Sequence, residues 1–277
     1  MPASGRQRPR GRADDQAAGG VVARVVCLLR AVAQAEGSIS IKQLGAEVGL
    51  APSTVHRLLD HLASAEMVER APHRRYRVSG EFSRIGALAA RRAGVLRLAE
   101  PSLRQVSDMT GETALLGVLL PQTLRMIFVD KANAATPVQY PIGMHRTRSL
   151  LWGATGLCLL AWLGDEEIAR VLNRRERSPV SSAPAPNQRV LAARLAEIRA
   201  RGYAITFGEQ TVGAVGIAAP VFGPDRRIVA DLCMTVPQTR FARGDEARFA
   251  GLLTSRAAQL SRMLGFQPPA VRRTSVI

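Results

Sequence analysis

The side chains best suited to chemistry follow Pro52, at the start of a predicted helix. Hydroxyl, imidazole and guanidinium groups succeed one another there, and such groups hydrogen-bond to phosphates and to the edges of bases. Apolar residues at spacings of three and four give the same helix a buried side. The outward residues are Ser53, Thr54, His56, Arg57 and His61, and the inward ones are Val55, Leu58, Leu59 and Leu62. This pattern is typical of a recognition helix that enters the major groove of DNA.

A shorter helix is predicted just before it. Ser40 is placed to cap the N terminus of this helix, and Gly49 supplies the left-handed conformation that ends it. Pro52 then suits the first position of the next helix, where its missing N–H is not needed. Two helices joined by a tight glycine turn form a helix-turn-helix.

After the recognition helix, residues 67–70 and 76–78 are short extended runs around a cationic tip that contains Arg74 and Arg75. This hairpin is the expected wing, whose arginines contact phosphates or enter a minor groove. The alternative is a helical hairpin in a core, followed by a solvated turn. The residues that we assign to DNA binding are Ser40, Pro52, Ser53, Thr54, His56, Arg57, Arg74 and Arg75.

Composition agrees with a nucleic-acid partner. The chain has 277 residues, of which 47% are hydrophobic, enough for two domains with real cores. Its formal net charge of +16 favours a polyanion as partner. Nearly all of the cations are arginines spread along the whole chain, which also fits a compositional bias of the genome. Charge therefore supports DNA binding without establishing it.

The cysteines indicate a reducing compartment. Cys27, Cys158 and Cys233 are odd in number and far apart, with no pair at metal-binding or redox spacing. The longest nearly apolar run, residues 150–163, is too short to span a bilayer. We therefore expect a cytoplasmic protein without a membrane partner.

The rest of the chain predicts an α+β protein. β-rich runs at 113–120, 124–129, 202–206, 217–222 and 228–236 alternate with helices at 166–177, 189–201 and 245–264, which is typical of an antiparallel α+β domain. Pro101 is expected to open a helix that closes near Gly111. The predicted parts are a disordered basic arm (1–20), a winged helix-turn-helix (21–80), a linker helix (81–98), an effector domain (99–267) and a tail (268–277).

The chain resembles the IclR family of transcriptional regulators from about Val21 to Phe266. The matching motifs are LAPSTVHRLL at 50–59, YRV at 76–78, GMHR at 143–146, GLCLLA at 156–161, GYA at 202–204 and VGAVGIAAPVF at 212–222. The resemblance implies a winged-helix dimer, or a pair of such dimers, that binds operator DNA. It also implies a GAF-like effector domain and control, as a repressor, of nearby genes by a small acidic or aromatic metabolite.

Matched by position, the resemblance implies an effector cavity lined by Gly153, Ala154, Thr155, Thr206, Gly216, Cys233 and Thr235. The chain also departs from the family. Leu157 stands where a lysine is usual, and Thr206 and Gly216 stand where relatives that bind small keto acids carry Asp and Cys. Because buried polar groups are kept where they have partners, we expect a roomier or more apolar ligand.

Two features stay open on the residues alone. The amides of residues 153–156, before an apolar helix, either bind a carboxylate or belong to a tight helix start that needs small residues for packing. His145, Arg146 and Arg148 either draw an anion in or are solvated loop cations.

No enzyme motif appears in the sequence. The sequence lacks a nucleophile elbow, a His-Glu-x-x-His motif, a phosphate loop and a dinucleotide fingerprint. His56 and His61 are five residues apart, a poor helical spacing for one metal ion. We expect no catalytic site, metal or cofactor. The alternative is a small-molecule-binding protein or metabolic enzyme with incidental N-terminal helices.

Overall fold

The structure is a computed structural model, and it describes residues 20–92, 94–133, 140 and 142–267. The chain divides into two compact units, Met1–Ala90 and Arg91–Ile277. Each unit has its own buried core, as the length and composition predicted. Apart from Gly20, the predicted arm (1–20) and the predicted tail (268–277) lie outside the described residues.

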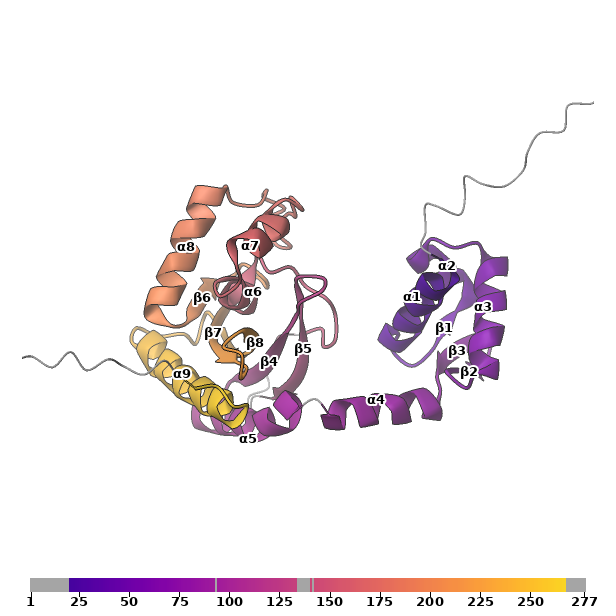
Figure 1. Ribbon diagram of the computed structural model, residues 1–277, viewed down its shortest axis with the longest axis horizontal. Helices are drawn as coiled ribbons and strands as arrows, with labels where there is room; N and C mark the ends of the chain where they lie inside the picture. Colours follow the sequence, from indigo (N-terminus) through magenta and orange to yellow (C-terminus); the bar gives the residue numbers. More distant parts are fainter. Residues whose placement is uncertain (1–19, 93, 134–139, 141, 268–277) are drawn as a thin grey trace, which may run out of the picture. The chain divides into compact units, whose positions relative to one another are not determined.

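The first unit places three helices on a small antiparallel sheet with strand order β1-β3-β2 (Figure 1). Its elements are α1 (Val21–Gln34), β1 (Ile39–Ser40), α2 (Ile41–Val48), α3 (Pro52–Ser64), β2 (Val68–Ala71) and β3 (Arg75–Val78). The winged helix-turn-helix is thereby confirmed. The two-residue strand β1 was not predicted, because two residues are too few to show an alternating pattern.

The predicted boundaries of the helix-turn-helix are confirmed in detail. Ser40 caps α2, and Gln43 completes a capping box by accepting a hydrogen bond from the Ser40 amide at 3.1 Å. Gly49 ends α2 with a φ of 68°, which a residue with a side chain rarely adopts. Pro52 is the first residue of α3. Local chemistry alone therefore determines this turn.

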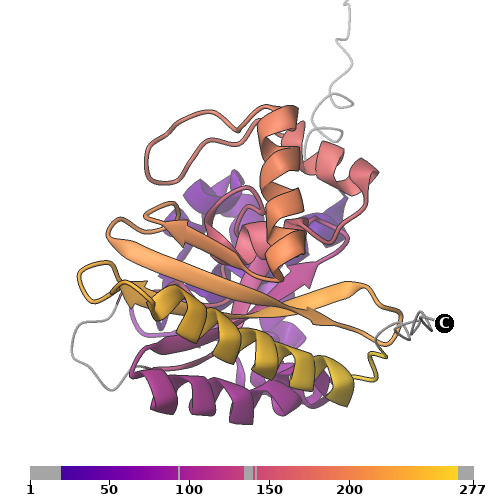
Figure 2. The same cartoon turned by 90° about the vertical axis from the view of Figure 1, so that its left-hand side faces the viewer.

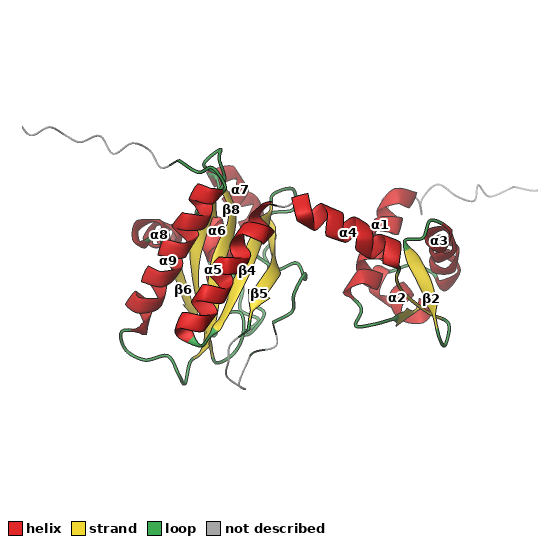
Figure 3. Cartoon of the chain, turned by 90° about the horizontal axis from the view of Figure 1, so that it is seen from below, coloured by secondary structure: helices red, strands yellow, loops and turns green. Residues whose placement is uncertain are grey.

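The second unit is an antiparallel five-stranded sheet with strand order β5-β4-β8-β7-β6, placed between two layers of helices (Figure 2). Helices α5 and α9 cover one face, seen side by side in Figure 3, and α6, α7 and α8 cover the other. The elements are α5 (Gly94–Thr110), β4 (Thr113–Leu120), β5 (Arg125–Ala132), α6 (Gly153–Leu160), α7 (Asp165–Leu172), α8 (Gln188–Arg201), β6 (Ala204–Phe207), β7 (Ala214–Phe222), β8 (Ile228–Pro237) and α9 (Asp245–Met263). The predicted antiparallel α+β domain is confirmed, with some ends shifted. Among the described residues, no helix has both the length and the apolar character needed to cross a membrane.

The predicted helix boundaries between the units are wrong. Instead of one helix over 80–98 and another opening at Pro101, α4 (Gly80–Arg92) is followed by α5, which runs through Pro101. A proline inside a helix leaves the carbonyl four residues earlier without its partner. Here Pro101 and Arg97, which carries that carbonyl, are both exposed, so water can satisfy the group. The apolar face of α5 packs on the sheet and outweighs the local penalty.

A carboxyl group lies buried in the middle of the sheet. Asp231 on β8 stands opposite Gly117 on β4 and is fully buried. A Cβ atom at Gly117 would lie 2.0 Å from Asp231 Oδ1, so the carboxyl occupies the space that a side chain there would need. Loss of hydration raises the pKa of Asp231 to about 7. Contacts with Thr155 and with backbone amides lower this pKa, but they have a smaller effect than burial. Neither carboxyl oxygen has a hydrogen bond of normal geometry.

This carboxyl should make the stability of the protein depend on pH. Because the folded-state pKa of about 7 lies above the ordinary value of 3.8, the folded chain holds the proton more tightly than the unfolded chain. The stabilisation is complete below about pH 4 and is lost as the pH rises through about 7, by up to about 4 kcal/mol. Asp231→Asn should remove this loss, as measured by urea unfolding between pH 5 and 8. An unchanged pH slope in the variant would contradict the assignment.

Candidate functional site

The recognition helix α3 presents its predicted outward side to solvent. Its four inward residues are buried, whereas Ser53, His56, Arg57 and His61 are exposed and Thr54 is half-buried. Within the described part of the chain, Arg57 has no hydrogen bond or ion pair. Its guanidinium is therefore available to an outside partner, as base recognition requires.

An acidic residue that sequence reasoning missed joins the recognition helix to the wing. Asp60 Oδ2 lies 2.9 Å from His56 Nδ1, and Asp60 Oδ1 accepts a hydrogen bond from Arg70 Nη2 at 2.9 Å. Arg70 belongs to β2, so this network connects α3 with the first strand of the wing. The spacing of four between His56 and Asp60 was a signal in the sequence, but the contact with Arg70 depends on the fold.

The two predicted wing arginines have different surroundings. Arg74 is exposed at the tip, adopts a left-handed φ of 54°, and makes no hydrogen bond or ion pair with another described residue. Arg75 lies in β3, where its Nε donates to Ser38 Oγ at 2.9 Å and its Nη2 donates to the Ser38 carbonyl. Ser40 likewise uses its hydroxyl to cap α2. DNA contacts by Arg75 and Ser40 stay a prediction, and the geometry favours Arg74.

Substitutions at Arg74 and Arg75 can distinguish a role in DNA binding from a role in the stability of the wing. Arg75→Ala should lower the free energy of unfolding by about 1–2 kcal/mol, because it removes hydrogen bonds between the wing and the segment before α2. Arg74→Ala should leave the free energy of unfolding unchanged. It should make the slope of log K for DNA binding against log salt concentration shallower by about one. Thermal melts and fluorescence anisotropy at several salt concentrations would measure both. Equal stability of the two variants would contradict the distinction.

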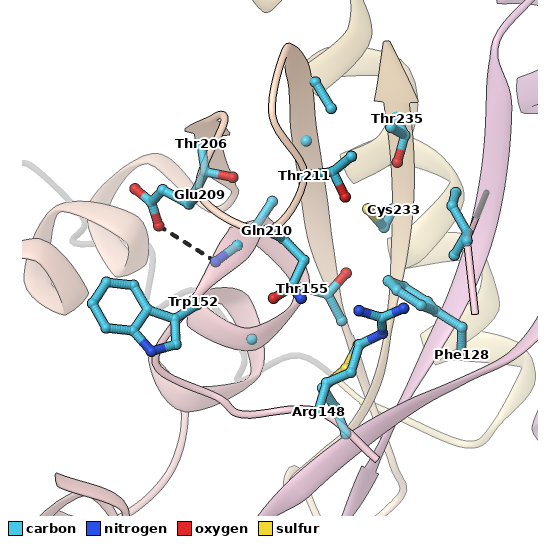
Figure 4. A pocket seen from close by; sticks show the side chains of 17 residues that line it. Phe128, Arg148, Trp152, Thr155, Thr206, Glu209, Gln210, Thr211, Cys233 and Thr235 are labelled. Atoms are coloured by element: carbon cyan, nitrogen blue, oxygen red, sulfur yellow. Dashed lines mark hydrogen bonds between the residues drawn. The ribbon is translucent and has the colours of Figure 1, made fainter. Parts of the chain in front are cut away.

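A cavity lies in the second unit between the start of α6 and the sheet (Figure 4). The space accessible to solvent inside it is about 70 Å³, and the cavity is open to solvent on one side. All seven residues that the resemblance implied line it, namely Gly153, Ala154, Thr155, Thr206, Gly216, Cys233 and Thr235. The fold thus brings together residues from α6, β6, β7 and β8, while their part in binding stays a prediction.

The cavity also has an apolar wall that sequence reasoning did not identify. Met126 and Phe128 come from β5, and Ile142 and Trp152 come from the segment between β5 and α6. A Cβ atom at Gly216 would lie 3.2 Å from the Cβ atom of Ala154, so glycine lets β7 pack closely against the start of α6. The apolar wall agrees with the expectation of an apolar ligand.

One loop cation points into this cavity. His145 and Arg146 are exposed, but Arg148 is half-buried and lines the cavity. Its Cζ lies 5.7 Å from the centroid of the Phe128 ring, its Nη2 donates to the Gly143 carbonyl at 3.3 Å, and its buried Nε has no hydrogen-bond partner. Burial, and to a lesser extent the charge of Arg146, lower the pKa of Arg148. Of the three cations left open by the sequence, Arg148 is the one placed to bind an anion.

A carboxylate of the protein itself lies at the N terminus of α6. Glu209, from the loop between β6 and β7, accepts a hydrogen bond from the Gly153 amide at 3.3 Å (Figure 4). Arg194 on α8 pairs with the other carboxylate oxygen. Gly153 has a φ of 78° and no room for a side chain, because a Cβ atom would lie 3.0 Å from Gln210 Cβ. Sequence reasoning missed Glu209, since 56 residues separate it from Gly153.

The hydroxyl of Thr155, like Arg148 Nε, is a polar group of the cavity without a hydrogen-bond partner. The residue is 4% exposed, and Figure 4 shows its oxygen directed into the cavity. The hydroxyl lies near the Asp231 carboxyl and the Cys233 thiol, yet forms no hydrogen bond of normal geometry. Burial raises the pKa of the Cys233 thiol, which therefore stays protonated. In the described residues, no cluster of three metal-ligating side chains occurs.

A winged helix-turn-helix joined to a separate α+β unit with a partly buried cavity is typical of a ligand-responsive transcriptional regulator. Two family models match the chain: the IclR helix-turn-helix domain over residues 21–72 and the bacterial transcriptional regulator IclR C-terminal domain over residues 87–262. The chain therefore belongs to the IclR family of transcriptional regulators.

Known relatives match over most of their length. The HTH-type transcriptional regulator BhcR of Paracoccus denitrificans is 30% identical over 263 residues, which cover 92% of this chain and 93% of BhcR. A solved IclR regulator from Silicibacter sp. TM1040 has a TM-score of 0.78 at 25% identity, covering 90% of this chain and 98% of that one. An IclR homologue from Microbacterium hydrocarbonoxydans, solved with 4-hydroxybenzoate, has a TM-score of 0.75 at 22% identity, covering 88% and 98%.

Proposed function

We propose that this regulator is a cytoplasmic repressor that binds operator DNA as a homodimer, or as a pair of dimers, and responds to an organic acid. We infer the ligand class from Arg148, which is a half-buried cation inside the cavity. Its Nε has no hydrogen-bond partner. A charge that is partly removed from water needs a compensating group. No carboxylate pairs with it in the described part of the chain, so the compensating anion comes from the ligand.

The remainder of the cavity supports an aromatic acid. Phe128 and Trp152 supply flat apolar surfaces, and Met126 and Ile142 extend them. Such a wall binds the ring of a ligand by burying apolar area, while one or two polar groups fix its orientation. The seven residues predicted from the family resemblance would then contact the ring and its substituents.

On the DNA side, α3 would lie in the major groove and the wing tip on the backbone. Two copies related by a two-fold axis would read half-sites one helical turn apart, or a multiple of it. The ligand can release DNA only by binding more tightly to a dimer whose recognition helices are wrongly spaced. We propose that α4 and the first turns of α5 transmit this change.

DNA recognition can be tested with duplexes taken from the region upstream of the gene. Arg57→Ala should weaken binding to the specific sequence by about 1–3 kcal/mol, because one side chain that reads a base is lost. Thr54→Ala should weaken it as well, while binding of both variants to random DNA changes less. Fluorescence anisotropy would measure these affinities. A protein that ignored these duplexes at low ionic strength would point to a small-molecule carrier or an enzyme instead.

The ligand class can be tested with benzoate, 4-hydroxybenzoate and phenylacetate. We expect these acids to raise the melting temperature of the second unit and their amides to have no effect, because Arg148 requires an anion. Arg148→Gln should weaken binding of the best acid by at least about tenfold, which corresponds to one strong charge-assisted contact. Arg146→Gln is the matched control, since Arg146 is exposed, and it should bind normally. Amides that bound as tightly as the acids would contradict the proposal.

A further inference from the structure

The N terminus of α6 is a site prepared for an anion. The first amides of a helix have no partner within the helix and carry a partial positive charge. In α6 these amides belong to Gly153, Ala154 and Thr155, all of which are buried and line the cavity. The residue before the helix, Trp152, provides no side-chain cap. Whatever satisfies these amides must therefore come from elsewhere in the fold or from a ligand.

Glu209 partly satisfies this terminus. Its Oε2 accepts the hydrogen bond from the Gly153 amide, and its Oε1 pairs with Arg194. The Glu209 side chain is 24% exposed, so water screens its charge only in part. A second carboxylate could approach the same amides only against the repulsion of the first.

An independent observation indicates that a ligand also reaches this end of the cavity. Thr155 is 4% exposed, and its hydroxyl has no hydrogen-bond partner although it points into the cavity (Figure 4). Buried hydroxyls without partners are rare, because the lost hydration is not replaced. A ligand group beside Thr155 would supply the missing hydrogen bond.

We propose that Glu209 determines ligand specificity by filling the anion subsite at the N terminus of α6. In this position it excludes small carboxylates from the helix terminus and directs the anionic group of the effector to Arg148. This inference rests on the proposed function, because it takes the cavity as the effector site. It follows that the opposite end of the effector, which faces Glu209, carries a hydrogen-bond donor such as a hydroxyl or amino group.

The test uses pyruvate, a carboxylate small enough to occupy the helix terminus alone. In Glu209→Ala the side chain that fills the subsite and its negative charge are both removed, and Arg194 loses its carboxylate partner, so the helix terminus and Arg194 both attract an anion. Isothermal titration of the full-length chain should show pyruvate binding to this variant at least about tenfold more tightly than to the wild type. The gain should persist in the double variant with Arg148→Gln, since this probe binds at α6.

Two variants serve as controls. Glu197→Gln makes the same change of charge on α8 at a side chain that is 67% exposed, and its affinity for pyruvate should equal that of the wild type. Glu209→Asp keeps the negative charge and should show no gain. Thermal melts of each variant would establish that it is folded.

The inference is overturned if Glu209→Ala binds pyruvate no better than the wild type, or if Glu197→Gln gains equally. Loss of the gain on adding Arg148→Gln would also overturn it, because the anion would then lie at Arg148. DNA affinity and the response to benzoate are measured on the wild type in separate experiments. A failure of those measurements would remove the proposed function, whereas a failure with pyruvate alone would remove only the role of Glu209.

Discussion

The buried first turn of α6 is the constraint on which the second unit depends. Every residue of this helix is buried, so its leading amides cannot be left to bulk water. Two requirements meet there. Packing requires a glycine at Gly156, where a Cβ atom would lie 2.9 Å from the Ser149 carbonyl oxygen. Hydrogen bonding requires an acceptor at Gly153, which Glu209 supplies. Packing of small residues therefore accounts for Gly156, whereas binding of a ligand carboxylate by these amides stays a prediction.

The charged side chains near the first turn of α6 differ in whether they have a partner of opposite charge. Glu209 has two partners, whereas Arg148 is partly desolvated and has no carboxylate beside it in the described part of the chain. Asp231 lies near Thr155, and because burial raises the pKa of Asp231 to about 7, it is only partly ionised at neutral pH and supplies at most part of a negative charge. The cavity thus has a deficit of negative charge. A ligand with one anionic group corrects that deficit without requiring any other residue to change its ionisation.

The features that the sequence predicted well are those decided within a few residues. The Ser40 cap, the Gly49 turn and the start of α3 at Pro52 were predicted correctly because each depends on local backbone chemistry. Pro101 was misassigned because packing of α5 on the sheet outweighed its local preference. The family resemblance placed seven residues in one cavity, but Glu209 could not be found in this way. Its contact joins segments 56 residues apart, and no local pattern marks it.

In the proposed dimer, release of DNA would draw on two effector sites. Each unit has its own core, so a ligand in the second unit would act in this proposal on how two copies of α3 are presented, and not on the packing of α3 itself. Reversing a 99:1 equilibrium requires a differential affinity of about 10⁴, or about 5.5 kcal/mol. A hydrogen bond to a charged group contributes about 1.5–3 kcal/mol, so one contact at Arg148 is too weak. Two equivalent contacts in the proposed dimer reach about the required energy, provided that they form in only one of the two arrangements.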